Sequence, residues 1–96
     1  MGHRLIERRL RDAGVRLRRL REELAVVDEQ LAHLRDDADD KGLRAMVSET
    51  PGAGSEYRDA QLHVDAMRRH RQSVLDSITE LEQRQDQLLD RMSQAR

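Results

Sequence analysis

The chain has 96 residues and one aromatic side chain, Tyr57, so it cannot build a large globular core. Charged residues make up 39% of the chain and apolar residues 36%, a balance typical of long helices and coiled coils. The net charge of −1 selects neither nucleic acid nor an acidic membrane, and the absence of cysteine excludes disulfides and thiolate metal sites.

The first predicted element is a helix over about residues 3–42. Its apolar residues recur in alternating steps of four and three, which keeps them on one helical face and is typical of a coiled-coil seam. The seam residues of this helix are Ile6, Leu10, Ala13, Leu17, Leu20, Leu24, Val27, Leu31, Leu34 and Ala38.

A connection is predicted over about residues 43–50, and its end is open between two helix starts. Thr50 followed by Pro51 is a good start, because the hydroxyl caps and proline has no amide hydrogen to leave unpaired. Gly52 and Gly54 disfavour helix, and Ser55 is a competing cap. We take the second helix to run over about residues 51–95, with a start at Ser55 as the alternative.

The second helix has a similar seam with two polar members, Arg71 and Gln85. Its residues are Tyr57, Ala60, Val64, Met67, Arg71, Val74, Ile78, Leu81, Gln85, Leu88, Met92 and Ala95. A polar seam residue either fixes the register of two helices or packs its stem in the seam while its polar end reaches water. For Arg71 the second interpretation is favoured.

The two seams align when the chain folds back on itself. Facing residues then have numbers with a constant sum, here 98, which pairs Leu17 with Leu81 and Leu20 with Ile78. The same sum places Val27 opposite Arg71. The sequence therefore predicts a single all-α domain over residues 1–96, an antiparallel two-helix coiled-coil hairpin.

Such a hairpin buries only one stripe of each helix. Ordering a residue costs about 1–2 kcal/mol of conformational entropy, and burial of these stripes is only just enough to offset that cost. Leu75 and Leu89 lie beside the seam, and Val26 lies further round the first helix. We expect these three residues to contact a second copy, so that a homodimer forms a four-helix bundle. The alternative is that Leu75 and Leu89 widen the seam within one chain.

Charge in the first helix opposes the helix dipole. Residues 1–21 hold eight Arg against two acids, whereas residues 22–41 hold eight acids against two bases. Either a partner or the second helix must compensate for this unfavourable charge distribution. If the second helix does so, the geometry of the hairpin predicts Asp28 near Arg68 and Asp37 near His63.

The same geometry brings arginines together on one flank, Arg9 near Arg91 and Arg16 near Arg84. This cluster is either a solvated face or a surface that binds phosphates without sequence specificity. The lack of aromatic side chains argues against stacking on nucleic-acid bases.

No residue pattern indicates an enzyme. Nucleophile motifs, phosphate-binding loops and metal-binding signatures do not occur, and His63 and His70 are about 10 Å apart along a helix, too far to chelate one metal. His33 and Asp37 near His63 offer a weak metal site as the alternative to solvated histidines. We therefore predict no catalytic residue, no cofactor and no metal. No apolar run is long enough for a membrane span and no secretory signal occurs, so we expect a cytoplasmic protein that does not bind membranes.

Residues 44–51 (RAMVSETP) and 56–61 (EYRDAQ), together with the stretch 80–92, resemble segments of small helical proteins of actinobacteria. That resemblance implies no activity. A looser resemblance is to the N-terminal coiled-coil hairpin of the Gre transcript-cleavage factors, carried by Asp39 and Asp40 before the tip and by Glu56, Tyr57 and Ala60 after it. It implies an acidic tip that enters the secondary channel of RNA polymerase, but Asp39 and Asp40 fall on the first helix rather than at the turn.

The function favoured by the sequence is a non-catalytic hairpin that binds a protein partner. Leu43, Met46 and Val47 have helical spacing near the tip and either bind that partner or cap the seam. A regulator of RNA polymerase, or a protein that binds the nucleic-acid backbone through Arg9, Arg16, Arg84 and Arg91, is the less favoured alternative.

Overall fold

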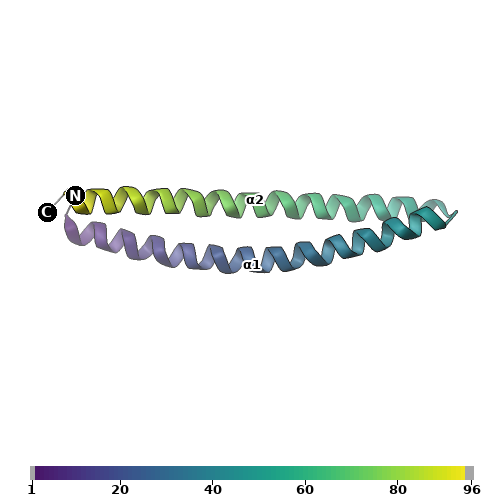
Figure 1. Cartoon of the computed structure of the whole chain (residues 1–96), viewed down its shortest axis with the longest axis horizontal. Coiled ribbons are helices and arrows are strands. Elements are labelled where there is room, and N and C mark those ends of the chain that lie inside the picture. Colours follow the sequence, from purple (N-terminus) through teal and green to yellow (C-terminus); the bar gives the residue numbers. More distant parts are fainter. Residues whose placement is uncertain (1, 95–96) are drawn as a thin grey trace. The chain divides into compact units, whose positions relative to one another are not determined.

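The structure, a computed structural model, describes residues 2–94, and within them the chain is all-α. Helix α1 (His3–Val47) and helix α2 (Pro51–Gln94) are joined by three residues, Ser48, Glu49 and Thr50 (Figure 1). The predicted all-α hairpin is confirmed, whereas Ala95 of the predicted second seam lies outside the described residues.

Each of two compact units takes residues from both helices. The terminal unit consists of Met1–Leu24 and Ser73–Arg96, and the tip unit consists of Ala25–Gln72. All seam pairs predicted from the constant sum fall within one unit or the other. The two units are therefore described separately below.

The core of the terminal unit joins α1 and α2 in the predicted register. Ala13 and Leu17 of α1 cluster with Val74, Ile78 and Leu81 of α2. Leu20 and Leu24 pack against this cluster, and Ile6 and Leu88 are buried in the same unit. The burial of these side chains follows from their common helical face, because each is three or four residues from the next.

The core of the tip unit is smaller and contains more alanine. Leu31 and Ala38 of α1 cluster with Ala60 and Val64 of α2, and Leu34 and Met67 pack against them. The pair Ala38 and Ala60 has the smallest side chains of the seam. Because less apolar area is removed from water at such positions, this end gains less stabilisation per turn than the Leu-rich end.

Helix α1 runs five residues beyond the predicted end at residue 42, which corrects the predicted connection over residues 43–50. No glycine among the described residues has the positive φ of a helix-ending glycine, and Gly42 lies within α1. A Cβ atom at this position would lie 3.0 Å from the ring of Tyr57, and glycine therefore lets the ring approach the α1 backbone.

The turn is closed by local hydrogen bonds. The Ser48 amide donates to the Arg44 carbonyl at 2.8 Å, and the Thr50 amide donates to the Ser48 hydroxyl at 3.2 Å. Helix α2 begins at Pro51, the first of the two starts that the sequence allows, and the Ala53 amide bonds to the Thr50 carbonyl at 3.2 Å. Pro51 suits the first helical position because its φ is already that of a helix and it has no amide hydrogen to leave unpaired.

Within residues 2–94, neither helix has a stretch that is long and apolar enough to cross a lipid bilayer.

Candidate functional site

The seam itself has no polar site in the described part of the chain. No polar or charged residue there is buried, and no buried side-chain nitrogen or oxygen lacks a hydrogen-bond partner. Of the two polar seam residues, Gln85 is half-buried, with its amide nitrogen 4.0 Å from where a Cβ of Gly14 would lie. Candidate sites therefore lie on the surfaces of the two units.

The side chain of Arg71 extends from the seam and forms an ion pair with α1 at its guanidinium end. Its Nε donates to Asp28 Oδ1 at 2.5 Å, and both side chains remain partly exposed. This geometry agrees with the favoured interpretation, in which the stem packs in the seam and the guanidinium reaches water. A shallow groove in the tip unit surrounds the pair and is lined by Asp28, Leu31, Ala32, Arg35, Arg68, Arg71 and Gln72.

The cross-helix pairs expected from the sequence are different in the structure. Asp28 was expected near Arg68; both line the groove just described, but Asp28 pairs with Arg71 while Arg68 is 4.0 Å from Asp65. The reason is local: Asp65 precedes Arg68 by one helical turn, so a neighbour on the same helix engages its guanidinium.

Asp37 also has a partner on its own helix. Its carboxylate lies 3.1 Å from Lys41 Nζ, one turn further along α1, and the expected approach to His63 stays a prediction. His3 similarly lies 3.1 Å from Glu7 within α1. No group of three His, Cys, Asp or Glu residues with metal-binding geometry occurs among residues 2–94.

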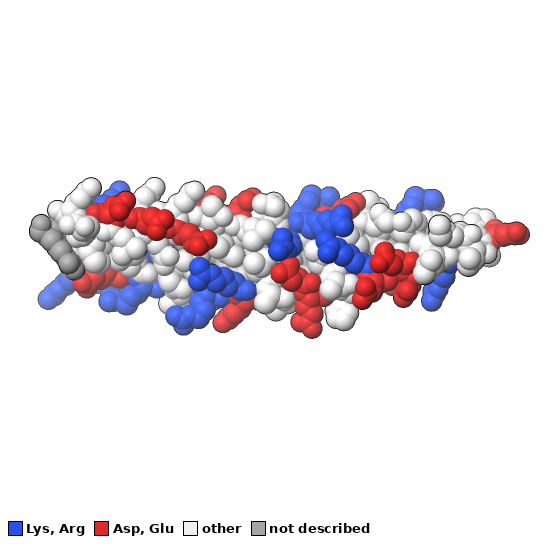
Figure 2. Space-filling view, in the orientation of Figure 1, with Lys and Arg blue, Asp and Glu red and all other residues white. Residues whose placement is uncertain are grey.

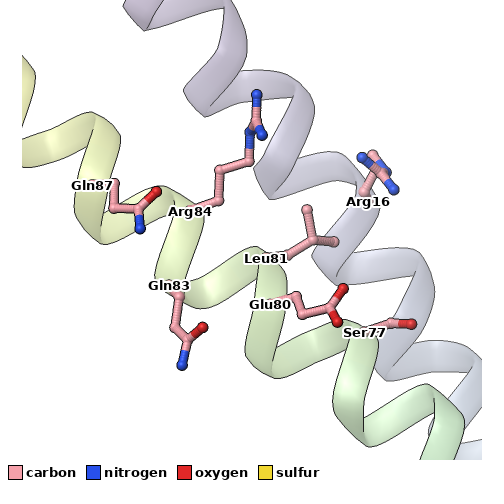
Figure 3. Close-up of a pocket in the computed structure, with 7 residues that line it drawn as sticks. All are labelled: Arg16, Ser77, Glu80, Leu81, Gln83, Arg84 and Gln87. Atoms are coloured by element: carbon pink, nitrogen blue, oxygen red, sulfur yellow. The ribbon is translucent and has the colours of Figure 1, made fainter.

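The arginine cluster is assembled as the sequence predicts. Arg9, Arg84 and Arg91 line one groove of the terminal unit, and Arg9, Arg16 and Arg84 line the adjoining one. A third groove is lined by Arg16 of α1 and Arg84 of α2, with Leu81 between them (Figure 3). We refer to this continuous surface, bordered by Arg9, Arg16, Arg84 and Arg91, as the arginine groove.

Other polar side chains complete the arginine groove. Ser77, Gln83 and Gln87 line it from α2, and Figure 3 shows all three projecting from that helix. Two carboxylates, Asp12 and Glu80, also line it and lower its positive charge. The groove is shallow and open to solvent, so its polar groups can contact a large ligand but cannot enclose a small one.

Acidic side chains follow α2 on one face of the terminal unit (Figure 2). On the face shown in Figure 2, the surface of the terminal unit is mostly acidic over α2 and mostly basic over α1. One cross-helix ion pair links the two, between Arg21 Nη2 and Glu82 Oε2 at 3.7 Å. Both side chains are more than half exposed, so the pair contributes at most about 1 kcal/mol.

The last turn of α1 exposes three apolar side chains. Leu43 is 64% exposed, Met46 83% and Val47 84%. Exposure of this extent does not favour the alternative prediction, that these residues cap the seam, because the facing helix would cover a seam residue. We call Leu43, Met46 and Val47 the apolar tip.

A shallow groove adjoins the apolar tip between the end of α1 and the first turns of α2. It is lined by Arg44, Val47, Ser48, Thr50, Gly52, Ala53 and Glu56. Gly52 has nothing within 4 Å of its Cβ position, so the α2 backbone is accessible there. On the visible face, the surface around the tip is mostly uncharged (Figure 2).

The three residues expected to contact a second copy fall in different units. Leu75 and Leu89 belong to the terminal unit and Val26 to the tip unit. Leu75 is half-buried beside the seam, while Leu89 and Val26 are each just over half exposed. Leu62 of α2 is also exposed, and the sequence analysis did not identify it as exposed apolar surface. Its position outside the heptad seam is the signal that would have identified it.

The acidic residues that carry the resemblance to Gre factors lie within α1. Asp39 and Asp40 are exposed and precede the end of the helix at Val47 by about two turns. The acidic residue of the turn itself is Glu49. The departure from the Gre pattern noted in the sequence is therefore present in the structure.

Comparison of the chain with protein-family models, with curated proteins and with solved structures finds no match.

Proposed function

We propose that this chain is a non-catalytic binding protein whose apolar tip engages a protein partner. The observation that carries the proposal is the exposure of Leu43, Met46 and Val47 on the last turn of α1. Exposed apolar side chains grouped on one helical turn are unfavourable in water, and such groups mark interaction surfaces.

The neighbouring groove supports the same proposal. An interface of this kind needs a central apolar contact and a polar rim. The apolar tip provides the centre, and Arg44, Thr50 and Glu56 provide charged and polar groups at its edge. The accessible backbone at Gly52 permits close approach of a partner side chain.

A photo-crosslinking amino acid introduced at Val47 tests the proposal in the cells that express the protein. Leu62 is the matched control position, because it is also apolar, exposed and within the tip unit but distant in sequence from the turn. We expect one reproducible protein adduct from Val47, none from Leu62, and at least a tenfold loss of the Val47 adduct in the variant Leu43→Ser/Met46→Ser. Identical adducts from both positions would overturn the proposal.

A second copy is proposed to pack against the terminal unit, giving a four-helix bundle built on coiled-coil packing. Leu89 supports this arrangement, because a large apolar side chain that is half exposed beside the seam can be covered by another hairpin. The solution mass tests it, as set out in the Discussion.

A further inference from the structure

The arginine groove is a linear array of cations. Arg9 and Arg16 are seven residues apart on α1, and Arg84 and Arg91 are seven residues apart on α2. Seven residues of helix rise about 10 Å, so each helix presents two guanidinium groups at that spacing along the groove. Arg84 lines all three grooves of this surface, and Arg9 and Arg16 each line two of them, which makes the array continuous.

Three of the four side chains are exposed to solvent. Arg16, Arg84 and Arg91 are exposed, and Arg9 is half-buried. None of the ion pairs found among residues 2–94 engages Arg16, Arg84 or Arg91. Like charges placed along one flank repel one another, so a polyanion that neutralises them relieves an unfavourable arrangement.

The chemistry of the groove fits phosphate better than it fits an acidic protein. Guanidinium groups donate paired hydrogen bonds that match phosphate oxygens, and Gln83, Gln87 and Ser77 add neutral donors. A protein interface would instead need an exposed apolar or aromatic anchor at its centre, whereas the apolar residues that line the arginine groove, Ala13, Leu81 and Leu88, are all buried.

We propose that the arginine groove of the terminal unit binds the sugar-phosphate backbone of a nucleic acid without sequence specificity. The ligand is a linear polyanion that lies along the groove and places phosphates near Arg9, Arg16, Arg84 and Arg91. Asp12 and Glu80 weaken this attraction, so binding is confined to low and moderate ionic strength. Binding is independent of sequence because its contacts are to phosphates, which carry no sequence information.

Fluorescence anisotropy of a labelled 20-base-pair DNA duplex, titrated with the full chain at 50–200 mM salt, tests the proposal. Four arginine–phosphate contacts give a slope of log K against log salt of about −3.6, which is a loss of affinity of about 100-fold over this range. The variant Arg16→Gln/Arg84→Gln is expected to halve the slope to about −1.8. Two duplexes of unrelated sequence should bind equally.

The variant Arg11→Gln/Arg18→Gln is the matched control. It removes the same charge from exposed positions of the terminal unit that do not line the groove, and circular dichroism checks that both variants remain helical. The control should keep most of the parent's affinity and slope. An equal loss in both variants would show attraction to general charge and overturn the site.

Two further results would overturn the proposal. One is the absence of binding at 50 mM salt by a chain that is fully helical. The other is displacement of the duplex by poly-glutamate as effectively as by unlabelled DNA at equal charge, which would assign the groove to acidic polypeptides. Displacement by unlabelled DNA alone supports the proposal.

Discussion

Gly42 of α1 and Tyr57 of α2 approach so closely that a Cβ atom on Gly42 would lie 3.0 Å from Cε1 of the tyrosine ring. That distance is shorter than ordinary van der Waals contact. The Tyr57 hydroxyl in turn accepts a hydrogen bond from Gln61 Nε2 at 2.6 Å, so displacing the ring also disturbs this bond. The contact joins the two helices near the turn.

Two glycine substitutions in α1 should therefore differ in their effect on stability. Gly14→Ala should raise the free energy of unfolding by about 0.5–1 kcal/mol, because alanine favours helix and only Gln85 Nε2, at 4.0 Å, is near the added methyl group. Gly42→Ala should raise the free energy of unfolding by less than Gly14→Ala, or lower it, because the Tyr57 ring must move away from the added methyl group. Urea unfolding followed by circular dichroism measures both, and equal gains would contradict the assigned contact.

Arg71→Leu should leave the hairpin as stable as the parent or more stable by about 1 kcal/mol. Leucine adds apolar area at a seam position, while the ion pair that it removes is partly exposed and contributes at most about 1 kcal/mol. Asp28→Asn, the control that breaks the same pair without adding apolar area, should lower stability by no more than about 1 kcal/mol. A large loss on Arg71→Leu alone would show that Arg71 fixes the register.

Leu17→Ala should destabilise the hairpin by about 2–5 kcal/mol, because Leu17 is 2% exposed at the centre of the terminal-unit core. Leu62→Ala is the control, with an expected change within about 0.5 kcal/mol because 63% of the Leu62 side chain is exposed. Thermal unfolding curves of the two variants at equal concentration give the comparison. Similar melting temperatures would contradict the assignment of the core.

Met46 should oxidise faster than Met67 or Met92 when the protein is treated with dilute hydrogen peroxide. Its side chain is 83% exposed, whereas the other two are half-buried in the seam. Peptide mass spectrometry over a time course measures the three rates. Equal rates would mean that the last turn of α1 is covered in solution, by a second copy or by another part of the chain.

The solution mass from light scattering on a sizing column, at low and at high salt, tests the proposed four-helix bundle. A dimer at both salt concentrations is expected, because apolar contacts are insensitive to screening. In the variant Leu75→Gln/Leu89→Gln the dimer should dissociate while helicity is retained. A parent chain that is monomeric at both salt concentrations would contradict the bundle and leave Leu89 as free apolar surface.

The sequence alone determined the class of fold and the register of the two helices. Periodicity is a collective signal: about ten apolar positions on each helix support one face and one alignment, so no single residue decides the outcome. The same alignment also brought Arg9, Arg16, Arg84 and Arg91 together, because positions beside a seam follow from the seam itself.

Only the tertiary structure decided where α1 ends, how charges pair and which apolar residues remain exposed. Gly42 lies within α1, and the ring of Tyr57, fifteen residues later, occupies the space that its missing side chain leaves; no local sequence pattern contains that information. Asp28 pairs with Arg71 and not with the predicted Arg68. The sequence could not distinguish these two pairs, because alternative surface ion pairs differ in stability by only fractions of a kcal/mol. Such small differences depend on the position of individual side chains in three dimensions, which the heptad pattern leaves open.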